Sequence, residues 1–203
     1  MVYEFKKDKF SIAKKAISKE LASFCYDYFL LKRMVAGYLF DYNVSSPQQG
    51  LWGTWQDPQV PNTYSCYGDI AMETLLKKVK PVMEKHTKLK LVETYAYARI
   101  YKKGDILHKH KDRESCEIST TLNLGGDNWP IMLNDGKKDI KITLTPGDML
   151  IYKGCELMHW RDEFDGENCA QVFLHYNNIK TIGDKNKYDG RPCLGLPSYA
   201  KSS

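Results

Sequence analysis

The chain has 203 residues, of which 42% are hydrophobic and 12% are aromatic, and its formal charge is +5. This size and composition predict one globular domain, and the sequence has no run of about 18 apolar residues that could span a membrane. The amino terminus, MVYEFKKDKF, lacks the apolar stretch of a signal peptide, so we expect a cytoplasmic location. Six cysteines without a CxxC pair argue against a zinc knuckle or disulfide scaffold, and the intermixed charges make a nucleic-acid partner unlikely.

The first predicted element is a packing helix over residues 11–36. Its apolar residues recur with the spacing of one helix face and are Ile17, Leu21, Phe24 and Tyr28. Gly37 follows the last of these residues and is expected to end the helix, since glycine is common just after helix ends.

An aromatic stretch over residues 37–68 comes next. Prolines and glycines, beginning with Pro47 and Gly50, interrupt any regular element there, while tyrosine and tryptophan are frequent. A loop of this length inside a compact domain is usually functional, so we expect it to cover the mouth of a pocket and to contact the substrate. A second helix is predicted over 69–85 from the stripe Leu75, Leu76, Val79 and Met83, with Pro81 in its last turn.

Short strands dominate residues 89–178. Apolar runs such as ETYAYARIY, EISTTLNL, IKITL, MLIYKG and AQVFLHY alternate with turn sequences such as GGDN and TPGD. Regular spacing of short strands predicts a sandwich or small barrel that can hold a ligand at its open end. Residues 1–88 are then helical support with the aromatic loop, and residues 179–203 form an irregular surface extension.

Three residues of this strand-rich half form a candidate metal site. His110 and Asp112 are two apart, so they share a face if they lie on one strand, and His159 ends a later predicted strand. Two histidines and one carboxylate leave coordination positions open and are the ligand set expected of non-haem iron(II) oxygenases. Zinc in a hydrolase is the chemical alternative. His108, on the same strand face, is the alternative to His110 as the first histidine ligand.

The motifs around these residues resemble a known family. The segments YARIYKKGDILHKHKDRESCEISTTLNLGG, WPIML, TPGDMLIYKGCELMHWRDEF and CAQVFLHY, within Leu91–Tyr176, are similar to the prolyl-4-hydroxylase-like branch of the 2-oxoglutarate/iron(II) oxygenases, in particular to small members from phage and marine microbial genomes. The resemblance implies an α+β fold with a double-stranded β-helix (jelly-roll) core and N-terminal packing helices. It also implies iron(II), 2-oxoglutarate and dioxygen, with hydroxylation of a small or peptidyl substrate. Proline as that substrate is an analogy alone.

The resemblance also assigns cosubstrate contacts. Tyr101 corresponds to a tyrosine near the 2-oxoglutarate carboxylate, and Thr121 lies where the family has another hydroxyl. Most members carry Arg or Lys about ten residues beyond the last metal-binding histidine, which is His159 here, but this chain reads ENCAQVFL in that region. Because a guanidinium is the usual partner of a carboxylate, Arg161 and, as second choice, Arg99 are the candidate substitutes.

Two other functions stay open at this stage. An oxidative demethylase of nucleic-acid bases uses the same iron site, and Trp52, Trp55 and Tyr64 could stack on bases, although a concentrated basic groove is missing from the sequence. A non-catalytic barrel that binds a metal or ligand is the alternative from another class.

Overall fold

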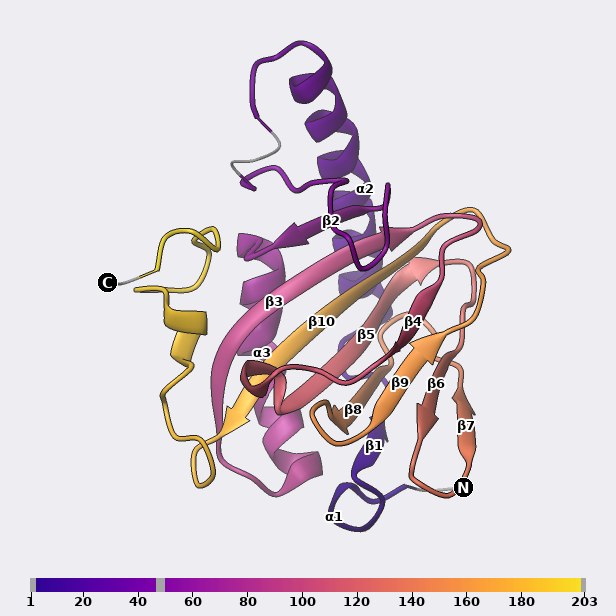
Figure 1. Ribbon diagram of the computed structural model, residues 1–203, viewed down its shortest axis with the longest axis vertical. Helices are drawn as coiled ribbons and strands as arrows, with labels where there is room; N and C mark the ends of the chain where they lie inside the picture. Colours follow the sequence, from indigo (N-terminus) through magenta and orange to yellow (C-terminus); the bar gives the residue numbers. More distant parts are fainter. Residues whose placement is uncertain (1–2, 47–49, 202–203) are drawn as a thin grey trace.

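The computed structural model describes residues 3–46 and 50–201, so Pro47 lies outside the described residues. Two antiparallel sheets form its centre (Figure 1). The larger sheet has the order β1 (Phe10–Ala13), β8 (Met149–Lys153), β5 (Ile118–Gly126), β10 (Cys169–Asn178), β3 (Leu91–Tyr101) and β2 (Tyr64–Tyr67). The smaller sheet has the order β4 (Leu107–His110), β9 (Met158–Arg161), β6 (Ile131–Asn134) and β7 (Asp139–Ile142). This non-sequential strand order in two facing sheets confirms the predicted jelly-roll core.

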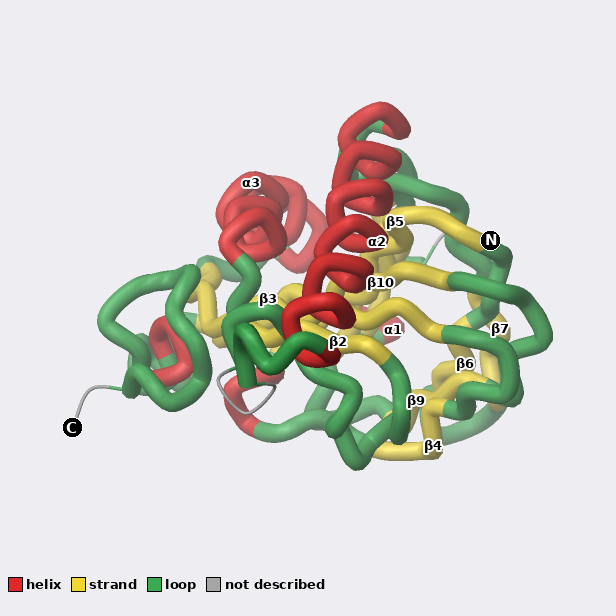
Figure 2. The backbone as a smooth tube through the Cα atoms, turned by 90° about the horizontal axis from the view of Figure 1, so that it is seen from above, coloured by secondary structure: helices red, strands yellow, loops and turns green. Residues whose placement is uncertain are grey.

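Helices cover the outer face of the larger sheet. Figure 2 shows α2 and α3 on one side of β3, β10 and β5, with the smaller sheet on the other side. The helical elements are α1 (Phe5–Asp8), α2 (Lys19–Asp41), α3 (Ile70–Thr87) and two short 3₁₀ turns, η2 (Glu114–Cys116) and η3 (Lys187–Gly190). Because β5 is covered on both faces, all its residues except the last are buried. Among the described residues, no helix has both the length and the apolar character of a membrane span.

The first predicted helix was wrong at both ends and in its buried face. Residues 10–13 form β1 instead, and α2 begins after Ser18, whose side chain accepts a hydrogen bond from the Leu21 N–H. The helix continues through Gly37, and Phe24 of the predicted face is 66% exposed. The residues that are buried are Ala22, Cys25, Phe29 and Ala36. Apolar side chains occur all around this helix, so their spacing did not single out the face that packs on β5.

The second predicted helix is confirmed as α3. Asp69 caps its first turn by accepting a hydrogen bond from the Met72 N–H, and the predicted apolar stripe is buried. The helix packs against β3 of the larger sheet. Its hydrophobic stripe has a polar opposite face, which is why periodicity identified the correct side here and not in α2.

The chain segments outside 89–178 contribute more than was predicted. Strands β1 and β2 belong to the larger sheet, so residues 1–88 are not helical support and loop alone. The stretch after β10 is irregular, but it is anchored in the interior. Arg191 forms an ion pair of 2.7 Å with Glu73 of α3, and both side chains are fully buried. Each of these charges compensates the burial of the other, and no local pattern in the sequence indicates the pairing.

The turn between β7 and β8 forms as the TPGD sequence predicts. Asp148 accepts hydrogen bonds from the backbone N–H and the hydroxyl of Thr145, and Gly147 has a φ of +89°. A Cβ at Gly147 would meet the Ile17 carbonyl at 2.7 Å, so a larger residue does not fit. The turn directs β8 back across β5 and thereby places Tyr152 between the two sheets.

Candidate metal centre and pocket

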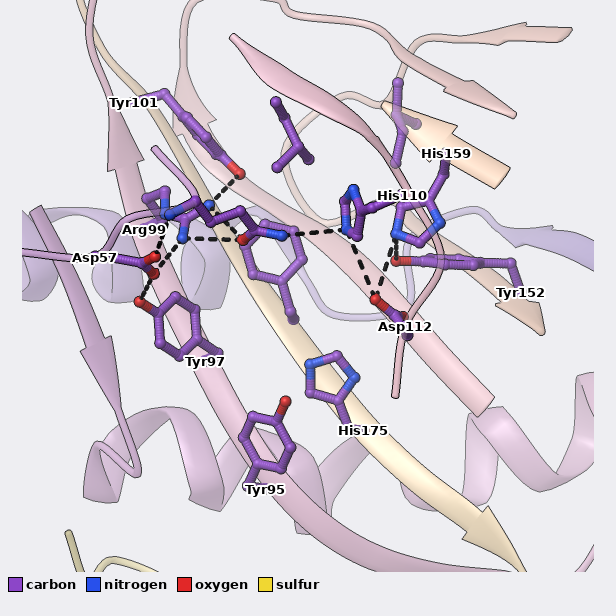
Figure 3. A pocket seen from close by; sticks show the side chains of 14 residues that line it. Asp57, Tyr95, Tyr97, Arg99, Tyr101, His110, Asp112, Tyr152, His159 and His175 are labelled. Carbon is purple, nitrogen blue, oxygen red and sulfur yellow. Dashed lines mark hydrogen bonds and ion pairs between the residues drawn. The ribbon is translucent and has the colours of Figure 1, made fainter. Parts of the chain in front are cut away.

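A pocket of about 180 Å³ lies between the two sheets. Its walls carry an unusual concentration of polar and aromatic side chains (Figure 3). They are Asp57, Gln59, Tyr95, Tyr97, Arg99, Tyr101, Leu107, His110, Asp112, Ile131, Tyr152, His159, Phe173 and His175. The strand β3 supplies Tyr95, Tyr97, Arg99 and Tyr101 from one face, as the alternation of the sequence predicts.

The structure brings His110, Asp112 and His159 together at one side of this pocket. One ligand atom of each residue lies within 4.8 Å of the others. The Asp112 Oδ1 atom is 3.7 Å from the His110 Nε2 atom and 3.5 Å from the His159 Nε2 atom. His110 and His159 face each other across β4 and β9. Asp112 lies two residues beyond the end of β4, where its backbone N–H donates to the Gly154 carbonyl at 2.9 Å.

Both histidines are oriented by the backbone of their own segments. The Nδ1 atom of His110 lies 2.8 Å from the His108 carbonyl, and the Nδ1 atom of His159 lies 3.0 Å from the Leu157 carbonyl. A carbonyl can only accept, so each Nδ1 carries the proton and each Nε2 keeps its lone pair for a metal. Burial lowers the pKa of His110, which favours the neutral form of the ring. His108 is exposed and lies outside the cluster.

Asp112 is held in place on its other side. Its Oδ2 atom accepts a hydrogen bond of 2.7 Å from the Ser119 hydroxyl, which leaves Oδ1 facing the histidines. A Cβ at Gly154 would come within 2.3 Å of Oδ2, so the carboxylate packs directly on this glycine. Burial raises the pKa of Asp112, but its contacts with His159, His175 and Ser119 together outweigh it and lower the pKa to about 2. The carboxylate is therefore ionised, as a metal ligand must be.

A buried histidine, His175, lies behind this carboxylate. Its Nδ1 atom is 2.9 Å from the Ser119 hydroxyl, and its ring packs 4.6 Å from the Tyr95 ring, centroid to centroid. Burial lowers the pKa of His175 to about 4, so the ring is neutral at ordinary pH. His175, Ser119 and Asp112 thus form a chain of polar contacts from β10 through β5 to the candidate metal ligands.

Arg99 forms the wall across the pocket from the histidines (Figure 3). Its side chain is 1% exposed and makes a 2.5 Å ion pair with Asp57, which also accepts a hydrogen bond from Tyr97. Burial raises the pKa of Asp57, but the charge of Arg99 and the hydrogen bonds from Tyr97, Gln59 and Arg99 together outweigh it, and the pKa is lowered. Both Nη atoms of Arg99 also contact the Gln59 side-chain oxygen at 3.1 Å. The sequence predicted Arg99 as a cosubstrate contact, yet it is already paired.

Arg161 is placed differently. It is 1% exposed, donates to the Trp129 carbonyl and to the Thr121 hydroxyl, the latter at 3.3 Å, and stacks on the Trp129 ring. In the described part of the chain its hydrogen bonds go to a carbonyl and a hydroxyl and not to a carboxylate, and its Nε atom has no hydrogen-bond partner there. Tyr101 also packs on Trp129, with ring centroids 4.7 Å apart. The structure therefore brings Arg161, Thr121 and Tyr101 to one region, although Arg161 and Thr121 lie behind the pocket lining and not in it.

Several pocket residues were missed from the sequence. Asp57 and Gln59 lie in the irregular stretch, where no periodicity places a side chain, although the segment did carry an expectation of substrate contact. His175 was present in the AQVFLHY strand, and alternation from Phe173 would have placed both on one face of it. Gly154, the last residue of the predicted run MLIYKG, is a weak signal, since a glycine there often marks a close approach of another segment.

No protein-family model matches the sequence, and no curated protein matches it. Solved structures do match. A prolyl-4-hydroxylase from Pseudomonas putida is 11% identical with a TM-score of 0.56, covering 86% of this chain and 95% of that one. HygX from Streptomyces hygroscopicus, solved with nickel and 2-oxoglutarate bound, is 12% identical with a TM-score of 0.61, covering 86% and 84%. A prolyl hydroxylase from Trichoplax adhaerens, in complex with a hypoxia-inducible-factor peptide fragment, is 14% identical with a TM-score of 0.59, covering 87% and 86%.

These similarities define the fold of the chain. It is the double-stranded β-helix of prolyl-4-hydroxylases and other 2-oxoglutarate/iron(II) oxygenases, which confirms the fold that the motifs implied. At 10–14% identity the similarity does not carry residue roles or a substrate from those proteins to this one. The function must be argued from the pocket itself.

Proposed function

We propose that this protein is a 2-oxoglutarate- and iron(II)-dependent oxygenase that hydroxylates a C–H bond of a small substrate. The observation that carries the proposal is the cluster of His110, Asp112 and His159, which presents two imidazole lone pairs and one ionised carboxylate oxygen to a single point of the jelly-roll pocket. This donor set fits a divalent iron with open coordination positions. The pocket beside it provides space for the reacting partners.

The chemistry at this site follows from the class of reaction. Bound iron(II), with 2-oxoglutarate and dioxygen, supplies the oxidation in which one oxygen atom enters the substrate C–H bond and the other enters succinate, with release of carbon dioxide. The protein's own residues hold and orient the metal-binding side chains. The carbonyls of His108 and Leu157 fix the two imidazole rings, and Ser119 fixes the carboxylate of Asp112. Such outer hydrogen bonds keep a metal site in its working geometry.

Arg161 is the residue that we assign to the distal carboxylate of 2-oxoglutarate. A buried guanidinium without an acidic partner costs several kcal/mol unless an anion reaches it. Thr121 is already within 3.3 Å of Arg161, and Tyr101, which packs on the same Trp129 ring as Arg161, lines the pocket. A dicarboxylate that extends from the metal cluster toward Arg161 would satisfy this charge. Arg99 fits this role less well, because Asp57 already neutralises it.

An anaerobic titration tests the proposal. Iron(II) should bind with a stoichiometry of one, and 2-oxoglutarate should bind more tightly in its presence. Admission of dioxygen should then yield succinate. Iron-dependent binding of 2-oxoglutarate without succinate formation, whatever substrate is added, would favour a non-catalytic barrel. Tight zinc binding with no affinity for 2-oxoglutarate would favour the hydrolase alternative.

The size of the pocket bears on the demethylase alternative. At about 180 Å³ it is smaller than the roughly 300–1,000 Å³ of pockets that hold drug-sized ligands, and much of it is enclosed by buried side chains. Of the aromatics that could have stacked on bases, Tyr64 is buried and donates to the Trp52 carbonyl, while Trp55 packs on Tyr64. These two rings are used within the fold, and of the three aromatics only Trp52 is exposed, so a small substrate is favoured over an extruded base.

A further inference from the structure

The side chain of Gln59 occupies the space between Arg99 and the candidate metal ligands. Its amide oxygen accepts from both Nη atoms of Arg99 at 3.1 Å, and its amide nitrogen lies 3.2 Å from the His110 Nε2 atom (Figure 3). That Nε2 atom carries the lone pair that would bind a metal, so the amide N–H donates to it in this structure. A metal bound to His110 must displace this contact. Gln59 would then keep only its contacts with Arg99 and would be held less firmly in this position.

Arg99 and Asp57 form a pair of opposite charges on the same wall. The guanidinium is 1% exposed, and the carboxylate is 16% exposed and thus partly open to the pocket. The pair has no net charge, because the charge of Arg99 holds Asp57 ionised with a lowered pKa. A ligand with a net charge would meet repulsion from one member of such a pair, whereas a ligand with both charges meets attraction at each.

We infer that the substrate is a free α-amino acid in its zwitterionic form. Its carboxylate takes the position of the Gln59 amide oxygen on the two Nη atoms of Arg99, and its ammonium group contacts the Asp57 carboxylate. The inference rests on the proposed function, because it names the substrate class of that same site. The inference adds that Arg99 binds the substrate, whereas the proposed function assigns Arg161 to the cosubstrate.

The geometry places the amino-acid side chain toward the metal ligands. The Gln59 amide alone spans the distance from Arg99 to the His110 Nε2 atom with contacts of 3.1 and 3.2 Å. A carboxylate bound at the oxygen position therefore brings carbons a few bonds away beside the metal cluster. Tyr95 and Phe173 border this space and offer apolar surface to a side chain. A small, compact side chain is expected, since the whole pocket measures about 180 Å³.

The same arrangement argues against a residue inside a peptide. An internal residue has neither a carboxylate nor an ammonium group, so its binding would leave the buried Arg99 and Asp57 with only each other and would bury polar amides against them. The peptide seen with the Trichoplax protein belongs to that protein.

Calorimetric titration of the full-length chain tests the inference. The twenty standard amino acids are titrated anaerobically into protein loaded with iron(II) and 2-oxoglutarate. The best-binding amino acid is then compared with its methyl ester, which lacks the carboxylate charge, and with its N-acetyl derivative, which lacks the ammonium charge. At least one free amino acid should bind, and each derivative should bind at least about tenfold more weakly, because each loses one charge-assisted contact.

Three variants assign the contacts to residues. Arg99→Gln should weaken the free amino acid at least about tenfold, and Asp57→Asn should weaken the free amino acid but leave the N-acetyl derivative unchanged. Gln59→Ala should retain binding or strengthen it, because it removes the group that occupies the carboxylate position. Arg33→Gln is the matched control. It removes a guanidinium that contacts Asn168 outside the pocket, and should leave amino-acid affinity unchanged.

The outcomes separate this inference from the proposed function. If 2-oxoglutarate binds with iron but no free amino acid binds, or if the derivatives bind as well as the parent, the amino-acid inference is wrong and the oxygenase proposal stands. A peptide or N-acetyl amino acid that binds more tightly than any free amino acid would overturn it in favour of a peptidyl substrate. If 2-oxoglutarate fails to bind while an amino acid binds in the manner described, the oxygenase proposal fails and the Arg99–Asp57 site stands as an amino-acid site. Circular dichroism establishes that each variant is folded, and the derivative series on the wild-type protein needs no variant.

Discussion

The two walls of the pocket are held by different kinds of structure. The metal-ligand wall, formed by His110, Asp112 and His159, is fixed by backbone carbonyls in or next to its own strands and by the close packing of Asp112 on Gly154. The arginine wall, formed by Arg99, is fixed by Asp57 and Gln59 from the irregular stretch before β2. Strand-based contacts cannot change without disrupting a sheet, whereas loop side chains can exchange partners. The first wall is thus preorganised, and the second can adapt to a ligand.

Loss of a metal ligand should have the largest effect. Asp112→Ala or His159→Ala removes one of three donors, so iron-dependent succinate formation should fall below detection while the circular dichroism spectrum is retained. Anaerobic iron titration and a succinate assay measure both effects. Asp165→Ala, at an exposed position, is the matched control and should keep full activity. Wild-type turnover in either ligand variant would mean that the metal-ligand wall has another purpose.

Gly154→Ala should have the next largest effect. Its Cβ would lie 2.3 Å from the Asp112 Oδ2 atom, so the carboxylate must shift away from the position that Ser119 now fixes. Changes to the groups that orient a ligand typically weaken metal affinity about 10–100-fold. The measurement is the iron dissociation constant, with 2-oxoglutarate affinity at saturating iron as the control. An unchanged iron affinity would show that this wall is less rigid than its contacts indicate.

Substitutions of the two arginines should then differ in their effect on the Michaelis constant for 2-oxoglutarate. Arg161→Leu should raise the Michaelis constant for 2-oxoglutarate at least about tenfold, equivalent to about 1.4 kcal/mol, with little change in iron affinity. Arg99→Leu should leave that constant near the wild-type value, because its guanidinium is paired with Asp57 and not with the cosubstrate. The reverse result would exchange the roles of the two residues. If neither variant weakens 2-oxoglutarate, its carboxylate is held elsewhere.

The difference between the walls also explains what the sequence could predict. The strands of the core, the turn at Gly147 and the grouping of His110, Asp112 and His159 follow from period-two alternation and turn residues, which are local properties of the chain. Even so, Asp112 lies beyond the end of β4, and its position depends on the Gly154 carbonyl of a distant segment.

Long-range side-chain contacts account for most of what the sequence did not reveal. Nothing near Asp57 in the chain indicates Arg99, and nothing near Glu73 indicates Arg191. The face of α2 was misjudged for a related reason. Small residues such as Ala22 and Ala36 pack on the sheet while the larger Phe24 is exposed, so a pattern based on large apolar residues does not identify the buried face.

The smallest effect is expected at His108, the rival to His110 in the sequence. Its side chain is exposed, and its contribution to the metal-ligand wall is the backbone carbonyl that accepts from the His110 Nδ1 atom. His108→Ala keeps that carbonyl, so iron binding should change by no more than about 0.5 kcal/mol, as for an ordinary surface substitution. The same titration and succinate assay as for the ligand variants provide the measurement, with His110→Ala beside it as the contrasting variant. A loss equal to that of His110→Ala would mean that the imidazole of His108 replaces the one at His110 when a metal binds, and that β4 must then turn its other side chains toward the pocket.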